Sequence, residues 1–266
     1  MYTAVFIPTM IYNSEAWSRL TATNIKQLQT AQLKCLKRIM KAAPSTPNSF
    51  VFLELGILPM EYEINKRQLV FLHHILSLPD TDPVRGIYEE LKAYPMAANW
   101  FSNITKLLVK YNLPSDEQNI VGLSRDTWKS RVKQAVVAEA VKVLLSDAKS
   151  KKKLSDISLP NTLKTQEYLM AYSSDISIVI FKLRGRSVNC LKNRGSDGPC
   201  RLCGHAKETQ EHAINCPIIA SGCELLSLQD VYGTVPLGEK RIRDIASRWM
   251  LFEEKVTECT SVSNNN

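Results

Sequence analysis

Three cysteines and one histidine near the C-terminus constrain the fold of this chain more than any other feature. They form the pattern Cys200-x2-Cys203 followed by His212-x3-Cys216. Two cysteines three residues apart can point at one ion from a tight turn, and Gly204 permits the positive φ that such a turn often needs. His212 and Cys216 share a face if they lie on a helix, because they are four residues apart. The spacing therefore predicts a closed Cys3His site, which is typical of structural zinc.

The other cysteines and the nearest histidine are expected to lie outside this site. His205 is the alternative nitrogen ligand, but it follows Cys203 by only two residues, and we prefer His212 because that spacing is cramped. Cys190 and Cys223 flank the motif without a partner at ligand spacing, so we interpret them as core or spare thiols. An odd total of seven cysteines, most of them clustered, favours a metal over disulfides. Metal binding would then be coupled to folding.

Positive charge is concentrated beside the motif. The chain has 34 Lys and Arg against 26 Asp and Glu, a net charge of +8. The cations of the window 182–201 are Lys182, Arg184, Arg186, Lys192, Arg194 and Arg201. The same window holds one acid, Asp197. Such patches bind phosphate backbones through counterion release, so the window predicts RNA or DNA as a partner. A solvated helix face is the alternative interpretation.

Apolar residues recur at helical spacing along most of the chain, which predicts a mainly α fold. The expected helices cover residues 24–41, 60–77, 83–94, 100–111, 125–147, 166–188 and 237–258. The helix over 166–188 is expected to break near Ser173-Ser174, and a short strand is expected over 231–235. A lysine run, Lys151–Lys153, opens a polar stretch. The sequence therefore predicts a helical region over 1–147, a linker over 148–164, a basic helix and zinc knuckle over 165–222, and a C-terminal helix and tail over 223–266.

Residue patterns that carry catalysis are missing from the sequence. A polymerase or nuclease needs clustered acids to hold Mg²⁺, and no Asp-Asp pair occurs. There is no glycine-rich phosphate loop either. We therefore predict no catalytic residues. No apolar run reaches the roughly 18 residues of a membrane span, and the apolar start lacks a basic leader, so we expect an intracellular protein without a membrane partner.

Several segments resemble one known family. They are Phe6–Trp17, Leu53–Pro59, Phe71–Leu76, Phe181–Arg184 and Cys200–Pro217. The first resembles the segment after the polymerase active site of non-LTR retrotransposon reverse transcriptases, where an apolar run precedes Tyr-Gly-Ser-Glu-x-Trp. Here Asn13 stands in place of the glycine. Leu53–Pro59 and Phe71–Leu76 resemble the thumb of that family. Phe181–Arg184, leading to Cys200–Pro217, is similar to its C-terminal zinc knuckle. The similarity runs over about residues 4–258.

The resemblance implies a non-catalytic, nucleic-acid-binding C-terminal part of a reverse transcriptase. A helical thumb-like bundle and the knuckle would grip template RNA and target DNA in the nucleus, beside a polymerase domain of the same parent protein. The catalytic aspartates of the family would lie upstream of Met1. The alternative is a helical protein-interaction scaffold with a zinc-stapled tail. Replacing Arg184 and Arg186 by Glu is expected to weaken RNA binding and to leave protein binding intact.

Overall fold

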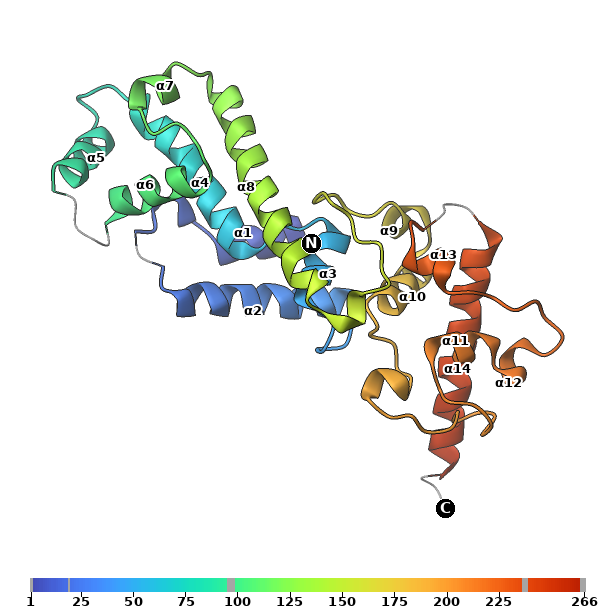
Figure 1. Ribbon diagram of the computed structural model, residues 1–266. Helices are drawn as coiled ribbons and strands as arrows, with labels where there is room; N and C mark the ends of the chain where they lie inside the picture. Colours follow the sequence, from blue (N-terminus) through green and yellow to red (C-terminus); the bar gives the residue numbers. More distant parts are fainter. Residues whose placement is uncertain (1, 19, 95–98, 236–238, 264–266) are drawn as a thin grey trace. The chain divides into compact units, whose positions relative to one another are not determined.

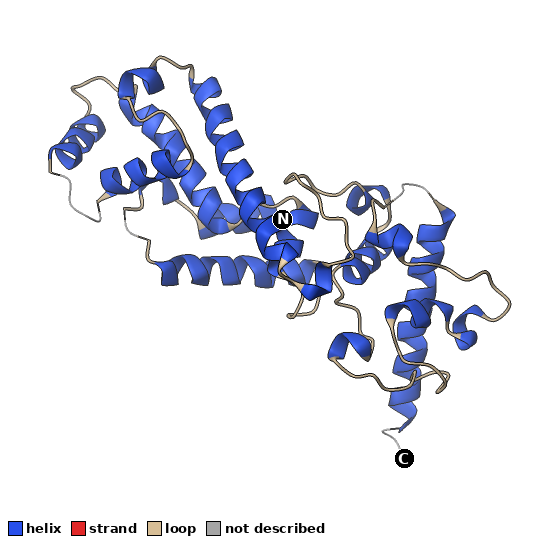
Figure 2. Ribbon diagram, in the orientation of Figure 1, coloured by secondary structure: helices blue, strands red, loops and turns tan. Residues whose placement is uncertain are grey.

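The computed structural model is built from helices (Figures 1 and 2) and describes residues 2–18, 20–94, 99–235 and 239–263. Within these ranges no strand forms, and one isolated antiparallel bridge pairs Pro199 with Lys207. The predicted mainly α class is confirmed. The strand predicted over 231–235 is wrong, because Gln229–Tyr232 forms helix α13. No helix in the described ranges combines the length and the apolar character needed to cross a bilayer.

The chain divides by its internal contacts into two units. Unit 1 comprises Met1–Leu33 and Leu58–Val143, and unit 2 comprises Lys34–Ile57 and Leu144–Asn266. The division differs from the predicted succession of 1–147, 148–164, 165–222 and 223–266. Residues 34–57 belong with the C-terminal half of the chain.

The segment predicted as a linker, 148–164, is part of unit 2. It buries Leu154 and Ile157. Directly after it, Thr165 donates a hydrogen bond to the carbonyl of Leu55 at 3.0 Å. Gly56 ends helix α3 at a φ of 64°, and a Cβ at this position would come within 2.2 Å of the backbone nitrogen of Thr165. The close approach of the two backbones explains why 34–57 and the segment 148–165 belong to the same unit.

Unit 1 is a helical body. Its helices are α1 (Ile7–Met10), α4 (Met60–Leu76), α5 (Pro83–Ala93), α6 (Trp100–Lys110), α7 (Glu117–Val121) and the larger parts of α2 (Ala22–Ile39) and α8 (Arg125–Lys149). The predicted starts of two helices are confirmed by side-chain caps, because Asp82 accepts from the N–H of Val84 and Asn99 from that of Ser102.

Two buried glutamines, Gln32 on α2 and Gln68 on α4, form hydrogen bonds that connect the N-terminal part of unit 1 to α4. Gln32 is fully buried, accepts from the N–H of Met60 at 2.9 Å and donates to the carbonyl of Leu58 at 3.0 Å. Gln68 donates to the carbonyl of Trp17 at 2.7 Å. Shortly before Trp17 the chain turns at Asn13, which has a φ of 54°. Asparagine tolerates this left-handed backbone better than most residues do.

Unit 2 is built around its last helix. The helices of this unit are α3 (Asn48–Leu55), α9 (Tyr168–Ala171), α10 (Ser174–Arg184), α11 (Gln210–Asn215), α12 (Pro217–Ala220), α13 and α14 (Lys240–Ser263). Helices α10, α11 and α12 pack on α14, which buries Trp249 and Phe252 completely (Figure 1). The predicted break at Ser173-Ser174 is confirmed, whereas the predicted start of the last helix at residue 237 lies outside the described residues.

A buried ion pair joins the segments of unit 2. Nη2 of Arg184, on α10, lies 2.8 Å from Oε1 of Glu54, on α3, and both side chains are almost fully buried. The same guanidinium donates to the carbonyls of Ser158, Val231 and Gly233. With Nε and Nη2 both donating to Oε1 of Glu54, all five N–H donors of the guanidinium are matched to acceptors from distant parts of the chain. The carbonyls at 231 and 233 are used here, which also explains why a strand does not form there.

Replacing Arg184 by Met is expected to lower the free energy of unfolding by about 3 to 5 kcal/mol, because it leaves the charge of Glu54 buried without a partner. Urea unfolding followed by circular dichroism measures the change. Arg194→Met is the matched control, because Arg194 is exposed and forms no ion pair within the described ranges. Equal urea midpoints for the two variants would contradict the central role of the pair.

Candidate metal centre

The first two cysteines lie on a tight loop closed by backbone hydrogen bonds. The N–H of Cys200 donates to the carbonyl of Ala206 at 2.7 Å, and the N–H of Gly204 donates to the carbonyl of Cys200 at 2.8 Å. Gly204 has a φ of 72°, the left-handed conformation predicted from its place after Cys203. The loop therefore presents both sulfurs from one turn.

The histidine and the third cysteine come from α11 and its end. Thr209 caps this helix, because its Oγ1 accepts from the N–H of His212 at 3.0 Å. His212 lies in the first turn, and Cys216 is the residue at which the helix ends. Pro217 then opens α12 in a new direction. His212 and Cys216 therefore both reach the group, although only His212 lies within the helix, because Cys216 has non-helical backbone at the helix end.

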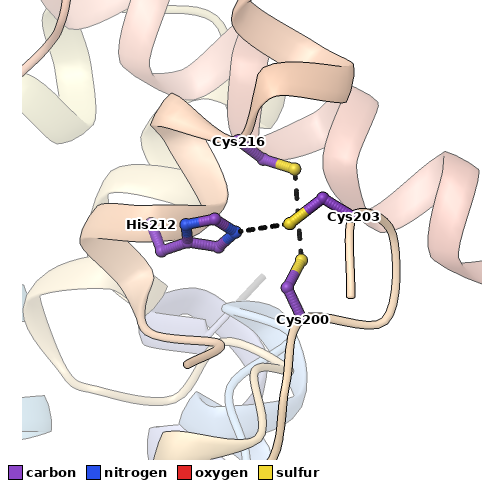
Figure 3. Close-up of side chains that lie close together, drawn as sticks. All are labelled: Cys200, Cys203, His212 and Cys216. Atoms are coloured by element: carbon purple, nitrogen blue, oxygen red, sulfur yellow. Dashed lines mark hydrogen bonds between the residues drawn. The ribbon is translucent and has the colours of Figure 1, made fainter. Parts of the chain in front are cut away.

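The four side chains converge (Figure 3). Sγ of Cys200 lies 4.0 Å from Sγ of Cys216, and Sγ of Cys203 lies 3.4 Å from Nε2 of His212. All four ligand atoms lie within 4.8 Å of one another, so these residues form a group that could hold a metal ion. Separations of this size fit four ligands arranged about one centre.

His212, Cys203 and Cys216 differ in how readily each offers a metal its deprotonated form. Burial lowers the pKa of His212, so the neutral imidazole that a metal requires predominates at neutral pH. The backbone N–H groups of His205 and Ala206 lower the pKa of the Cys203 thiol. Burial raises the pKa of Cys216 to about 12. A bound cation would therefore be needed to hold this last sulfur as a thiolate.

An ion pair between the buried Glu208 and the partly exposed Arg201 holds the loop in place. The carboxylate of Glu208 is fully buried and lies 2.6 Å from Nη2 of Arg201. It also accepts from the N–H groups of Leu191 and Arg201, each at 3.0 Å. Burial raises the pKa of Glu208, but these hydrogen bonds outweigh it and leave the pKa below the usual range. Glu208 thus holds Arg201, the residue directly after Cys200.

Most cations of the predicted basic window are engaged inside the protein. Arg184 is buried on Glu54. Lys182 lies 3.1 Å from Glu253, and Arg201 lies on Glu208. Arg186 stacks on Tyr232 at 4.2 Å and lies 3.4 Å from Asp156. The prediction that Arg184 binds nucleic acid is wrong, because its side chain is buried in unit 2. Lys182, Arg186 and Arg201 are partly exposed, and their role as nucleic-acid ligands stays a prediction.

Only two of the six predicted cations are well exposed, Lys192 and Arg194. Replacing Arg184 and Arg186 by Glu therefore cannot test RNA binding, since the change at 184 would place two carboxylates together in the core. Lys207 was not among the predicted cations, but it lies within the motif, between Cys203 and His212, and its side chain is 69% exposed. Counting cations on both sides of Cys203 would have found it.

The remaining thiols and histidine take the places predicted for them. His205 does not belong to the converging group, and neither do Cys190 and Cys223. Cys190 is fully buried and Cys223 is exposed. Glu208, by contrast, carried no signal as a single residue, because a buried acid and a surface acid look the same in a sequence.

Comparison with models of protein families, with curated proteins and with solved structures finds no match to this chain. The site itself is therefore the basis for any statement about function.

The purified chain is expected to bind one Co²⁺ with the visible absorption bands of tetrahedral thiolate coordination. Cys216→Ser removes one of the sulfurs and should weaken binding and shift these bands. Cys223→Ser is the control, because this exposed thiol lies outside the group. The assignment fails if both variants bind Co²⁺ like the unsubstituted chain.

Arg201→Met is expected to lower the free energy of unfolding by about 2 to 3 kcal/mol, because Glu208 stays buried without its main partner. The depressed pKa of Glu208 means that the stabilisation is present above the pKa of an unfolded glutamate and is lost as the pH falls through the folded value. Urea midpoints at neutral and acidic pH measure both effects. Lys192→Met, which breaks an exposed ion pair with Asp197, should change the midpoint little.

Proposed function

We propose that this chain is a non-catalytic, nucleic-acid-binding part of a non-LTR retrotransposon reverse transcriptase, in which the Cys3His group holds a structural zinc ion. The convergence of Cys200, Cys203, His212 and Cys216 is the observation that carries the proposal. RNA or DNA would be the ligand, and a polymerase domain of the same parent protein would supply the chemistry.

The donor set supports zinc. Three sulfurs and one imidazole are soft and borderline donors, which suit zinc better than magnesium or calcium. Four protein ligands leave no position open for a substrate, so the ion would serve the structure. When bound, it would join the loop of Cys200 and Cys203 to helix α11.

Exposed cations around the site support a nucleic-acid ligand. Lys192, Arg194 and Lys207, here named the knuckle rim, are all exposed. The first and last of these side chains are 58% and 69% exposed and share one acid, Asp197. Exposed ion pairs of this kind are weak, so a phosphate can replace the carboxylate at little cost.

The turn at Asn13 supports the family assignment. The segment Tyr12–Trp17 resembles a pattern with glycine at the second position. Asn13, at that position, has the positive φ that glycine and asparagine accept most easily. A glycine could adopt the same left-handed conformation, so the replacement is compatible with the pattern.

Fluorescence anisotropy of the full chain with single-stranded RNA, titrated with salt, tests the proposal. Arg194→Gln combined with Lys207→Gln should weaken binding and reduce the salt slope by about 1.4, the value for two lost contacts to a single strand. Removing the metal with a chelator should weaken binding as well, because the rim residues would no longer be held in place.

Lys240→Gln combined with Arg243→Gln is the matched control. It removes one lysine and one arginine, both exposed on α14, and should leave the salt slope unchanged. A chain that binds no strand at low salt would contradict the proposal and favour the protein-interaction scaffold. Mg²⁺-dependent polymerase or nuclease activity of the purified chain would contradict the non-catalytic role.

A further inference from the structure

A groove lined by positive charge lies on unit 1, between helices α4 and α8. The groove has a volume of about 560 Å³. Its charged lining residues are Glu15, Lys66, Arg67, Arg125, Lys129 and Lys133. Five cations therefore face one acid. We call this feature the α4–α8 groove; it shares no residue with the metal centre or the knuckle rim.

The cations of α8 form a regular stripe. Arg125, Lys129 and Lys133 follow one another at intervals of four residues, about 6 Å along the helix. All three are exposed, and within the described ranges none forms an ion pair. Trp128, which is adjacent to Lys129 on the same helix, is fully buried and donates from Nε1 to the carbonyl of Leu69 on α4. The packing therefore fixes the direction of the stripe.

Helix α4 adds charge from the other side. Lys66 lies 2.6 Å from Oε2 of Glu63, and Arg67 lies 3.7 Å from Oε1 of the same residue. One carboxylate thus serves two cations. Like charges at helical spacing repel one another, so the groove has unbalanced positive charge that an anion would neutralise. The arrangement suits a chain of phosphates, which carries one charge per nucleotide, better than a single anion.

The groove also offers partners for the rest of a nucleotide. The rings of Phe71 and His74 line it, with centroids 5.8 Å apart and planes tilted by 34°. His74 is exposed, so a base can stack on this pair. Oε2 of Glu15 is buried without a hydrogen-bond partner in the described ranges, and a ribose hydroxyl or a base amino group can donate to it. Inorganic phosphate offers neither a flat ring nor these donors.

We propose that the α4–α8 groove binds a single strand of nucleic acid, with phosphates on the stripe of α8 and a base on Phe71 and His74. The inference rests on the proposed function for the class of ligand, and it assigns a contact surface that the knuckle does not provide.

The test uses the full chain and a short fluorescein-labelled oligoadenylate. Lys129→Gln combined with Lys133→Gln should weaken binding about tenfold at low salt and reduce the salt slope by about 1.4. Lys106→Gln combined with Lys142→Gln is the matched control, since it removes two exposed lysines of unit 1 that do not line the groove. His74→Ala should weaken strand binding about fivefold and leave competition by inorganic polyphosphate unchanged.

The outcomes separate the two proposals. If the unsubstituted chain binds the strand but the variant with Lys129→Gln and Lys133→Gln binds like its control, the proposal for the groove is overturned. The proposed function then still stands. If the unsubstituted chain binds no strand, both are overturned. If the lysine variant weakens strand and polyphosphate equally while His74→Ala changes neither, the groove is a site for polyphosphate and the assignment of a nucleic-acid strand is overturned.

Discussion

The buried pair of Arg184 and Glu54 is the interaction on which unit 2 depends. One guanidinium satisfies a carboxylate from α3 and backbone carbonyls at 158, 231 and 233. Each of these groups would be buried without a partner if the arginine were absent, so the cost of losing it exceeds that of one salt bridge. The metal centre relies on α10 and α11 packing against α14, and α10 is the helix that carries Arg184.

The candidate site was largely predictable because its ligands are local in sequence. Two cysteines on a turn, one ligand in a helix and one at its end need only short-range geometry, and the structure brings all four together. The helices were predictable for the same reason: caps such as Asp82 and the apolar periodicity act within a few residues.

The division of the chain into units could not be predicted from the sequence, nor could the burial and ion pairing of the cations in residues 182–201. Glu54 and Arg184 are separated by 130 positions, and no sequence pattern around either residue predicts that they pair. A sequence records that Arg184 is charged, but its burial depends on which acid the fold places beside it. The unpaired stripe on α8 was overlooked for the converse reason, since helical spacing shows which residues share a face but not which face lacks partners.

The position of α3 has a consequence for how the protein is made. Phe50, Val51, Phe52 and Leu53 are completely buried, and helix α3 ends one position before Gly56, which lies against the backbone of Lys164 and Thr165. On a ribosome this helix emerges long before the residues that cover it. More than a hundred further residues must be translated before Arg184 can reach Glu54. During that interval the growing chain exposes apolar side chains of α3, a surface of the kind that chaperones bind.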